Sequence, residues 1–490
     1  MKKLLIALLA LLMCLSVFAG CADNTNGTDA GENEQTQDTV APEETVNMNY
    51  VPELNDSVST KGKTLKLLIN NGFWAADDVW MEEDSDDAVA SAIYQRNHTV
   101  MDTYGFDILP TLSTTVNADI KMADKSGSTD YDVAIFCCYE ACPTASEGIF
   151  LDLTTVENLN LKKHYWDQDM YADLSIDGKL FYITGDISTK AGAGTFLMIY
   201  NKNIAQSYDL ENLYDLVREG KWTIDKLNQI VSEHGYVDDG DGVVGVEDTF
   251  GMGIQIEAYL ALYFGCGGRI VVKDNEDLPV FELNTSKNLS ILEKIYDLTC
   301  VDDKVIDSHL WLDVTGTSQF ASTLAFQEGR SLFIITNASN IASFREMDAD
   351  FGVLPCPKFD ETQENYCSYV YHGAAVYCIP RNCTDPAFVG FALEALAAES
   401  YKTVTPAYYE KTLYGQYQRD SDSYEMLDIA FRNRLRDLVY YARFGGIDDA
   451  FIAQIKKGPD TFVSFCNSQK AVSKQIKKYI AAYEKATSAS

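Results

Sequence analysis

Hydrophobic and polar positions divide the chain into three stretches of unequal length. Residues 4–17 are almost entirely apolar, and residues 22–60 are rich in Asn, Thr, Asp, Glu and Gln. From about Lys61 onward, short apolar runs alternate with segments whose apolar positions recur every three or four residues. Short apolar runs are typical of buried strands and the longer spacing is typical of helices, so the third stretch is predicted to fold.

The first stretch is predicted to be a targeting segment. Lys2 and Lys3 precede an apolar run that is too short to span a bilayer comfortably. The sequence Phe18-Ala19-Gly20-Cys21 then resembles a bacterial lipobox, with Phe where Leu is usual. We predict a signal peptide over 1–20, lipidation of Cys21 and a disordered tether over 21–60, whose composition buries too little apolar surface to fold. Ordinary cleavage with Cys21 unmodified is the alternative.

Strands and helices alternate at the start of the body. Thr64–Ile69, Phe106–Leu109 and Tyr131–Cys138 have the composition of strands, and Asp87–Tyr104 has helical spacing. This order predicts an α/β fold with a parallel sheet. Ligands of such folds gather at the carboxyl ends of the strands.

Two later stretches are predicted to connect separate lobes. Leu180–Thr184 ends at Gly185-Asp186, a run containing Gly192 and Gly194 follows, and a second strand begins at Thr195. Glycine tolerates backbone angles that other residues avoid, so this run is predicted to be a hinge. The stretch Tyr369–Ile379 is predicted to be the returning strand. A chain of 490 residues is expected to form at least two domains, here two cores joined by thin connections beside a ligand cleft.

The charge and the motifs exclude several classes of function. The chain has 73 acidic and 39 basic residues, a formal charge of −34, which repels nucleic acid and anionic lipid headgroups. It contains no H-E-x-x-H, G-x-S-x-G or G-x-x-x-x-G-K-[ST] motif. Enzyme motifs of these kinds are missing, although the many acidic residues leave a carboxylate pair of the glycosidase type open.

The aromatic content points to a different class of ligand. The chain has 29 Tyr, 23 Phe and 5 Trp, and sugars bind by stacking their C–H faces on aromatic rings in preformed pockets. Most of these rings must belong to the core. Four aromatic residues beside loops at strand ends are predicted to contact ligand instead: Trp74, Tyr139, Trp311 and Tyr371. Trp166 and Trp222 are predicted to be structural.

The sequence Asp238-Asp239-Gly240-Asp241-Gly242 has features of a calcium loop. Asp239, Asp241 and Asp248 occupy ligand positions if Gly242 is the invariant glycine. Val237 then falls at the first ligand position and has no oxygen to offer. An acidic solvated turn is the alternative, and no other cofactor is predicted.

Ten of the twelve cysteines lie beyond Cys14 and Cys21, without a C-x-x-C pair. Most lie in apolar runs, which favours small buried side chains over metal ligands. Disulfides remain open at this point.

Several ordered motifs together resemble the extracellular solute-binding proteins of family 1, the lipoprotein receptors of ABC importers. These motifs span Ile93–Ile108, Asp177–Asp186, Tyr200–Asn203, Gly220–Leu227, Asp238–Gly251 and Phe351–Lys358. The resemblance covers nearly all of the body. It implies a two-lobed periplasmic-binding-protein-like fold of type II that closes by a hinge over a mono- or oligosaccharide. It also implies an ATP-driven permease as the partner, an extracytoplasmic location and no catalysis.

Mapped onto this chain, the resemblance implies one lobe of residues 61–185 with 373–424 and another of 186–372 with 425–490. Position within these lobes selects the predicted ligand-binding residues: Asn71, Trp74, Tyr139, Asp186, Trp311, Asn337, Tyr371, His372 and Arg443. An ordinary cap or turn is the alternative for each polar member. A surface carbohydrate-active enzyme and a structural or adhesion lipoprotein are the alternative functions.

Overall fold

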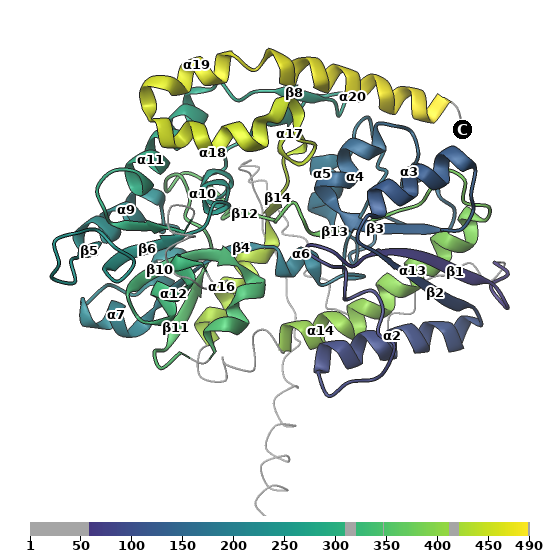
Figure 1. Ribbon diagram of the computed structural model, residues 1–490, viewed down its shortest axis with the longest axis horizontal. Helices are drawn as coiled ribbons and strands as arrows, with labels where there is room; N and C mark the ends of the chain where they lie inside the picture. Colours follow the sequence, from purple (N-terminus) through teal and green to yellow (C-terminus); the bar gives the residue numbers. More distant parts are fainter. Residues whose placement is uncertain (1–57, 309–319, 346, 411–420, 489–490) are drawn as a thin grey trace, which may run out of the picture. The chain divides into compact units, whose positions relative to one another are not determined.

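One sheet is built mainly from the first strands of the body. The computed structural model describes residues 58–308, 320–345, 347–410 and 421–488 (Figure 1). Three parallel strands lie in the order β3 (Val133–Cys137), β1 (Thr64–Asn70) and β2 (Asp107–Ser113), and β13 (Ala375–Cys378) pairs antiparallel with β3. The predicted parallel arrangement is confirmed, and a strand from much later in the chain completes this first sheet.

The helices of the first sheet begin at the capping residues that their sequences supply. The Asp87 side chain accepts hydrogen bonds from Val89 N and Ala90 N at the start of α2, and Gly105 ends this helix in the left-handed conformation. Figure 1 shows α2 and α13 on one face of the sheet and α3 and α4 on the other. The bounds are α2 Ala88–Tyr104, α3 Val116–Ser126, α4 Cys138–Ala145, α13 Pro386–Lys402 and α14 Val404–Tyr409.

A second, mixed sheet has the strand order β11-β4-β10-β6-β5, and β9 pairs with β6 further along the edge that β5 occupies. β4 is antiparallel to both of its neighbours, whereas β6 is parallel to β10 and β9. The strands are β4 Phe196–Asn201, β5 Tyr236–Val237, β6 Thr249–Ile254, β9 Val305–Asp307, β10 Ser331–Asn337 and β11 Phe351–Leu354. The helices of this region are α7 Lys202–Ser207, α8 Leu213–Arg218, α9 Ile224–Glu233, α10 Ala258–Gly265, α11 Ser286–Thr299, α12 Ala321–Gln327, η2 Ala338–Phe344 and α16 Ser421–Arg432.

Two of the segments along which the chain passes between the two sheets lie side by side. Ile183 and Tyr377 form one antiparallel bridge and Thr195 and Val370 form another. The backbone N–H of Tyr371 also donates to the Gly194 carbonyl at 2.7 Å. We call residues 180–195 the outgoing crossover and residues 369–379 the returning crossover. Short elements precede or lie within the outgoing crossover: η1 Leu153–Thr155, α5 Gln168–Leu174 and α6 Lys190–Ala193.

Three details of the predicted crossovers are wrong. Leu180–Thr184 makes single bridges rather than a continuous strand. The returning crossover is interrupted between Tyr369 and Ala375, where Ala374 N donates to the Tyr371 carbonyl and closes a turn. Gly194 has an ordinary φ of −82°, so its small size is needed for another reason. A Cβ there would lie 3.1 Å from the Lys190 carbonyl and 3.2 Å from Tyr371 Cβ, so glycine lets the two crossovers approach.

The apolar core is continuous across the crossovers, in contrast to the two separate cores that were predicted. One buried cluster includes Leu67 of the first sheet and Met198 of the second. The crossover side chains, such as Phe181 and Tyr377, are themselves buried and join the two regions. The described residues all belong to one compact unit, so the exact division into two lobes stays a prediction.

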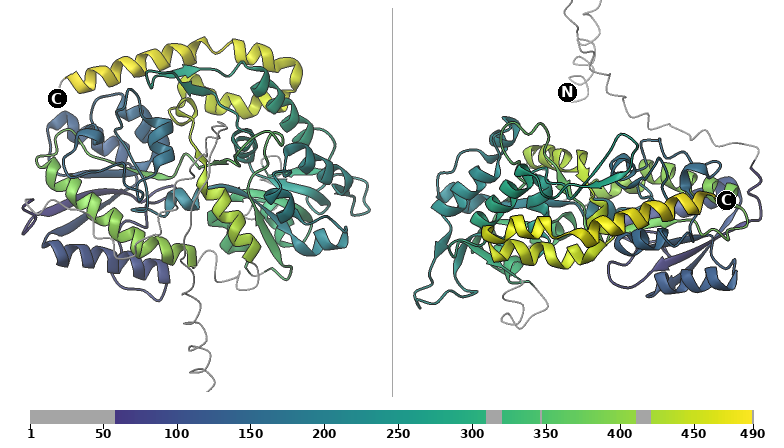
Figure 2. Two further views of the ribbon diagram at one scale, coloured as in Figure 1. Left: turned by 180° about the vertical axis from the view of Figure 1, so that it is seen from behind. Right: turned by 90° about the horizontal axis from the view of Figure 1, so that it is seen from above.

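The C-terminal helices return to the first sheet. The Tyr479 hydroxyl of α20 donates a hydrogen bond to the Cys142 carbonyl on α4. The ring of Tyr483, also on α20, packs on Phe181 with centroids 4.6 Å apart. Figure 2 shows α20 running past both regions. The remaining elements are β7 Val271–Lys273, β8 Pro279–Phe281, β12 Ser368–Tyr369, β14 Arg434–Leu435, α17 Leu438–Tyr441, η4 Phe444–Gly446, α18 Ile447–Lys457, η5 Pro459–Thr461, α19 Phe462–Asn467 and α20 Lys470–Ser488.

The predicted structural roles of two tryptophans and of the cysteines are confirmed. Trp166 and Trp222 are buried, and their indole N–H groups donate to Glu394 and to the Pro355 carbonyl, each at 3.0 Å. All ten cysteines within the described residues are free thiols, and most are buried.

Candidate functional site

The loop after β1 is shaped by a buried asparagine. The Asn70 side chain accepts from Gly72 N at 3.0 Å and donates to the carbonyls of Phe73 and Trp74 at 3.1 Å each. Trp74 has a φ of 50°, in the left-handed region that non-glycine residues rarely adopt. The hydrogen bonds of Asn70 therefore hold the backbone that presents the Trp74 ring.

The Trp74 ring meets an aromatic residue of the returning crossover. Its centroid lies 4.7 Å from that of Tyr371, and Phe73 makes an edge contact with the same ring at 6.5 Å. Trp74 is half-buried and Phe73 is 70% exposed. An accessible aromatic surface thus lies at the carboxyl end of β1, as expected for a binding site.

A second group of rings continues from the carboxyl end of β3. Tyr139, at the start of α4, donates its backbone N–H to the His372 carbonyl at 3.0 Å, and the two rings are 5.3 Å apart. The Arg443 guanidinium lies 4.2 Å from the Tyr139 ring and pairs with Asp448 at 3.2 Å. Tyr440 of α17 contacts His372 with ring centroids 5.6 Å apart. We call Trp74, Tyr139, Tyr371, His372, Tyr440 and Arg443 the aromatic cluster.

His372 is a neutral polar group in this cluster at physiological pH. Burial, assisted by the nearby Arg443 charge, lowers the pKa of His372 to about 4. Its Nδ1 lies 2.8 Å from the Tyr369 hydroxyl, which fixes the ring orientation. A neutral, oriented imidazole can donate or accept a hydrogen bond with a hydroxyl-bearing ligand.

A cavity of about 320 Å³ opens beside the cluster. Its polar walls include Glu257, which precedes α10, together with Asp448 and Lys456 of α18. This volume lies at the small end of the range for ligand pockets. The cavity combines rings with carboxylate, guanidinium and ammonium groups, which suits a polar ligand with apolar faces.

The structure brings together most of the predicted site residues. Trp74, Tyr139, Tyr371, His372 and Arg443 all belong to the aromatic cluster. Asn71 lies in the same loop with an exposed side chain.

The three other predicted residues lie neither in the cluster nor in the loop after β1, or fall outside the described residues. Asn337 ends β10 and accepts a hydrogen bond from Ser339 at 2.5 Å. Asp186 lines a different cavity. Trp311 lies outside the described residues, as do Cys21 and the predicted signal peptide.

The sequence reasoning missed Asn70, Glu257 and Tyr440. Glu257 follows β6 closely, so the rule of strand ends that selected Trp74 would also have selected it. Asn70 is the last residue of β1, and its exposed neighbour Asn71 was predicted to be the site residue instead. No pattern in the sequence indicates Tyr440, because a long-range fold places α17 beside the crossover.

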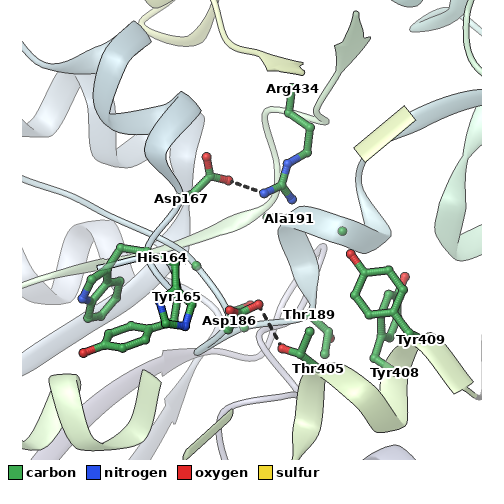
Figure 3. Close-up of a pocket in the computed structure, with 14 residues that line it drawn as sticks. His164, Tyr165, Asp167, Asp186, Thr189, Ala191, Thr405, Tyr408, Tyr409 and Arg434 are labelled. Carbon is green, nitrogen blue, oxygen red and sulfur yellow. Dashed lines mark hydrogen bonds and ion pairs between the residues drawn. The ribbon is translucent and has the colours of Figure 1, made fainter. Parts of the chain in front are cut away.

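Figure 3 shows the second cavity, which is smaller and lies on the outgoing crossover. The Asp186 carboxylate accepts a hydrogen bond from Thr405 Oγ1 at 3.0 Å. Burial raises the pKa of Asp186 to about 6, although the Thr405 hydrogen bond opposes this rise. Across the cavity Arg434 pairs with Asp167 at 3.0 Å. Although burial opposes ionisation, Arg434 and Arg436 lower the pKa of Asp167 to about 2.

The acidic loop folds around its own carboxylates. Oxygens of Asp238, Asp239 and Asp241 lie within 4.8 Å of one another. Asp248 is buried and accepts hydrogen bonds from the Tyr236 hydroxyl and from the backbone N–H groups of Asp239 and Gly245. These donors occupy the carboxylate that the calcium hypothesis assigned to the last ligand position, and calcium binding stays a prediction.

No family model matches the sequence, and no curated protein matches it either. Solved structures do match the fold. The cyclic α-maltosyl-1,6-maltose binding protein of Arthrobacter globiformis has a TM-score of 0.52 at 13% identity, over 86% of this chain and 98% of that chain. An ABC substrate-binding protein of Listeria monocytogenes, in complex with cycloalternan, has a TM-score of 0.51 at 12% identity, over 87% and 99%. A cyclo/maltodextrin-binding protein complexed with maltotetraose has a TM-score of 0.51 at 10% identity, over 86% and 96%.

The fold is that of a two-lobed periplasmic binding protein. The predicted fold class is therefore confirmed, and at these identities the similarity concerns the fold alone. Among the described residues, no helix combines the length and apolar character that a membrane crossing requires.

Proposed function

We propose that this chain is a solute-binding lipoprotein of family 1 that captures a carbohydrate for an ABC importer. The observation that carries the proposal is the aromatic cluster, in which rings from the ends of β1 and β3 meet rings of the returning crossover. A sugar would stack on Trp74 and Tyr139 while His372, Glu257 and Arg443 hydrogen-bond its hydroxyl groups.

The similar structures support this class of ligand. Two of them are binding proteins in complex with maltotetraose and cycloalternan, and the third binds a cyclic maltosyl sugar. All three are binding proteins rather than enzymes, which supports a role in capture without catalysis. Because two crossovers connect the two sheets, ligand binding would close the protein by bending these segments.

Two parts of the proposal concern regions beyond the aromatic cluster. The anchor would be a lipid on Cys21 at the extracytoplasmic face of the membrane, reached through the 21–60 tether. The partner would be the membrane subunits of an ABC permease. Labelling cells with an alkyne fatty acid tests the anchor, since Cys21→Ala should lose the label.

A glycan panel tests the carbohydrate site. The purified chain that begins after Cys21 is mixed with maltooligosaccharides, cyclic glucans and mannooligosaccharides, and its thermal midpoint is measured. A ligand at 100 times its Kd stabilises the native state by about 2.7 kcal/mol. We expect a saturable rise with at least one glycan, and a smaller or absent rise in Trp74→Ala. A panel without any shift would contradict the proposal, and release of shortened sugars would favour the enzyme alternative.

A further inference from the structure

The small cavity on the outgoing crossover has features of a separate binding site. Its volume is about 80 Å³, enough for several waters or a molecule of a few heavy atoms. Gly185 and Gly192 are among its lining residues. A Cβ on Gly192 would lie 3.4 Å from Tyr408 Cε1, so a larger side chain there would take up the space.

The two carboxylates that line this cavity, Asp167 and Asp186, differ in their partners. Asp167 pairs with both Arg434 and Arg436, at 3.0 and 2.7 Å. Asp186 makes no ion pair with any described residue, and Thr405 is its hydrogen-bonding side chain. Asp186 is therefore the lining carboxylate that has no ion-pair partner among the described residues.

Aromatic rings flank the Asp186 carboxylate. Figure 3 shows His164 and Tyr165 on one side of Asp186, with Tyr408 and Tyr409 of α14 on the other side beyond Thr405. A cation held near aromatic faces gains about 0.5–2 kcal/mol from each favourable contact. Carboxylate and rings together suit a cation that also carries carbon.

We propose that this cavity binds a small organic ammonium ion, with its nitrogen against Asp186 and its carbon atoms against the tyrosine rings. Although the Nε of Arg434 has no hydrogen-bond partner, an anion fits less well because two carboxylates line the cavity beside this single guanidinium. A hydrated alkali ion would make little use of the rings. The site is separate from the aromatic cluster and does not depend on the carbohydrate proposal.

Binding of methylammonium chloride tests the site. The purified chain is titrated at pH 7.5 by calorimetry and by thermal shift, with potassium chloride at the same ionic strength as the comparison. We expect saturable binding of methylammonium and a higher midpoint than in potassium chloride. Asp186→Asn should weaken binding at least tenfold, whereas Glu361→Gln, which removes an exposed carboxylate elsewhere, should bind as the wild type does.

A second pair of variants and a pH series test the site even if Asp186→Asn does not fold properly. Tyr408→Leu removes a ring and should weaken binding severalfold, whereas Tyr408→Phe should retain it. Protonation of Asp186 competes with the cation, and a pKa of about 6 predicts about tenfold weaker binding at pH 5.0 than at pH 7.5. The titratable and charged groups that line the cavity with Asp186 are Arg434, Asp167, His164, Tyr165, Tyr408 and Tyr409, and Tyr401 also interacts with its carboxylate.

Three results would overturn this proposal. These are the absence of methylammonium binding by the wild type, equal effects of methylammonium and potassium, and unchanged binding in Asp186→Asn. These outcomes do not depend on the glycan panel, because the two sites are separate. Trp74→Ala should lose glycan affinity and still bind methylammonium as the wild type does.

Discussion

The Trp74 ring packs on the Tyr371 ring with centroids 4.7 Å apart and an angle of 46° between the planes. One ring belongs to the loop after β1, and the other belongs to the returning crossover. The contact therefore joins a strand end of the first sheet to a segment that connects the two sheets. Any ligand that stacks on Trp74 lies directly beside the connection that would have to bend on closure.

Replacing Trp74 by Ala should separate binding from stability. The loss of a stacking ring is expected to cost about 1–2 kcal/mol of binding free energy, a five- to thirtyfold loss of glycan affinity. The free energy of unfolding should fall by only about 1 kcal/mol, because the ring is half-buried. Trp222→Ala is the matched control, since that ring is fully buried and should cost about 3–5 kcal/mol of stability. Calorimetric titration and urea unfolding measure the two effects, and a large stability loss in Trp74→Ala would contradict the assignment.

Asn70 and Asn71 should behave differently although they are neighbours. Asn70→Ala removes three hydrogen bonds that shape the loop, so we expect a loss of about 1–3 kcal/mol in stability and weaker glycan binding. Hydrogen exchange over residues 71–76 should become faster without ligand. Asn71→Ala should leave exchange and stability unchanged and alter only glycan affinity. Equal behaviour of the two variants would show that Asn70 does not organise the loop.

Gly185 should tolerate no side chain. A Cβ at this position would lie 2.2 Å from the Tyr165 carbonyl oxygen and 2.8 Å from Trp166 Cα. Since these are backbone atoms, Gly185→Ala should destabilise the protein by about 3 kcal/mol. Gly245→Ala is the control, because its nearest neighbour would be 3.7 Å away. Urea unfolding compares the two variants, and a wild-type midpoint for Gly185→Ala would contradict the close approach.

The stability difference between Asp186→Asn and the wild type should depend on pH. An unfolded aspartate ionises near pH 4, whereas burial raises the folded pKa of Asp186 to about 6. The folded state thus binds the Asp186 proton more tightly than the unfolded state does. The stability gained in this way is fully present below pH 4 and is lost as the pH rises through 6. In amine-free buffer the free energy of unfolding of Asp186→Asn should equal that of the wild type at pH 4. At pH 7.5 it should be larger by on the order of 1–3 kcal/mol. A constant difference across this range would refute the raised pKa.

Calcium should not change the stability of the protein if the acidic loop is a hydrogen-bonded turn. The Asp248 carboxylate is already occupied by three donors of the chain. We therefore expect the same thermal midpoint in 1 mM calcium and in EDTA. A rise with calcium that Asp239→Asn removes would favour the calcium hypothesis, and Asp130→Asn serves as the exposed control.

Local sequence patterns were sufficient to predict the strands and helices and part of the candidate binding site. The apolar run of β1, the Asp87 cap of α2 and the Pro386 start of α13 follow from neighbouring residues alone. Strand ends could be located in the same way, and this is why Trp74 and Tyr139 were found. Asp186 was predicted to bind ligand but lines a different cavity from the one beside the aromatic cluster, because its position at a crossover does not indicate which side of that crossover it faces.

An acidic α/β protein with a predicted lipid anchor can be inferred from the sequence, because composition, periodicity and capping act over a few residues. Three features follow from the packing of the whole chain: the crossovers pair with each other, one apolar core passes through them, and Tyr371 and Tyr440 meet the rings of the first sheet. These contacts join residues hundreds of positions apart. Their geometry depends on how whole sheets pack, and short-range sequence patterns do not indicate that packing.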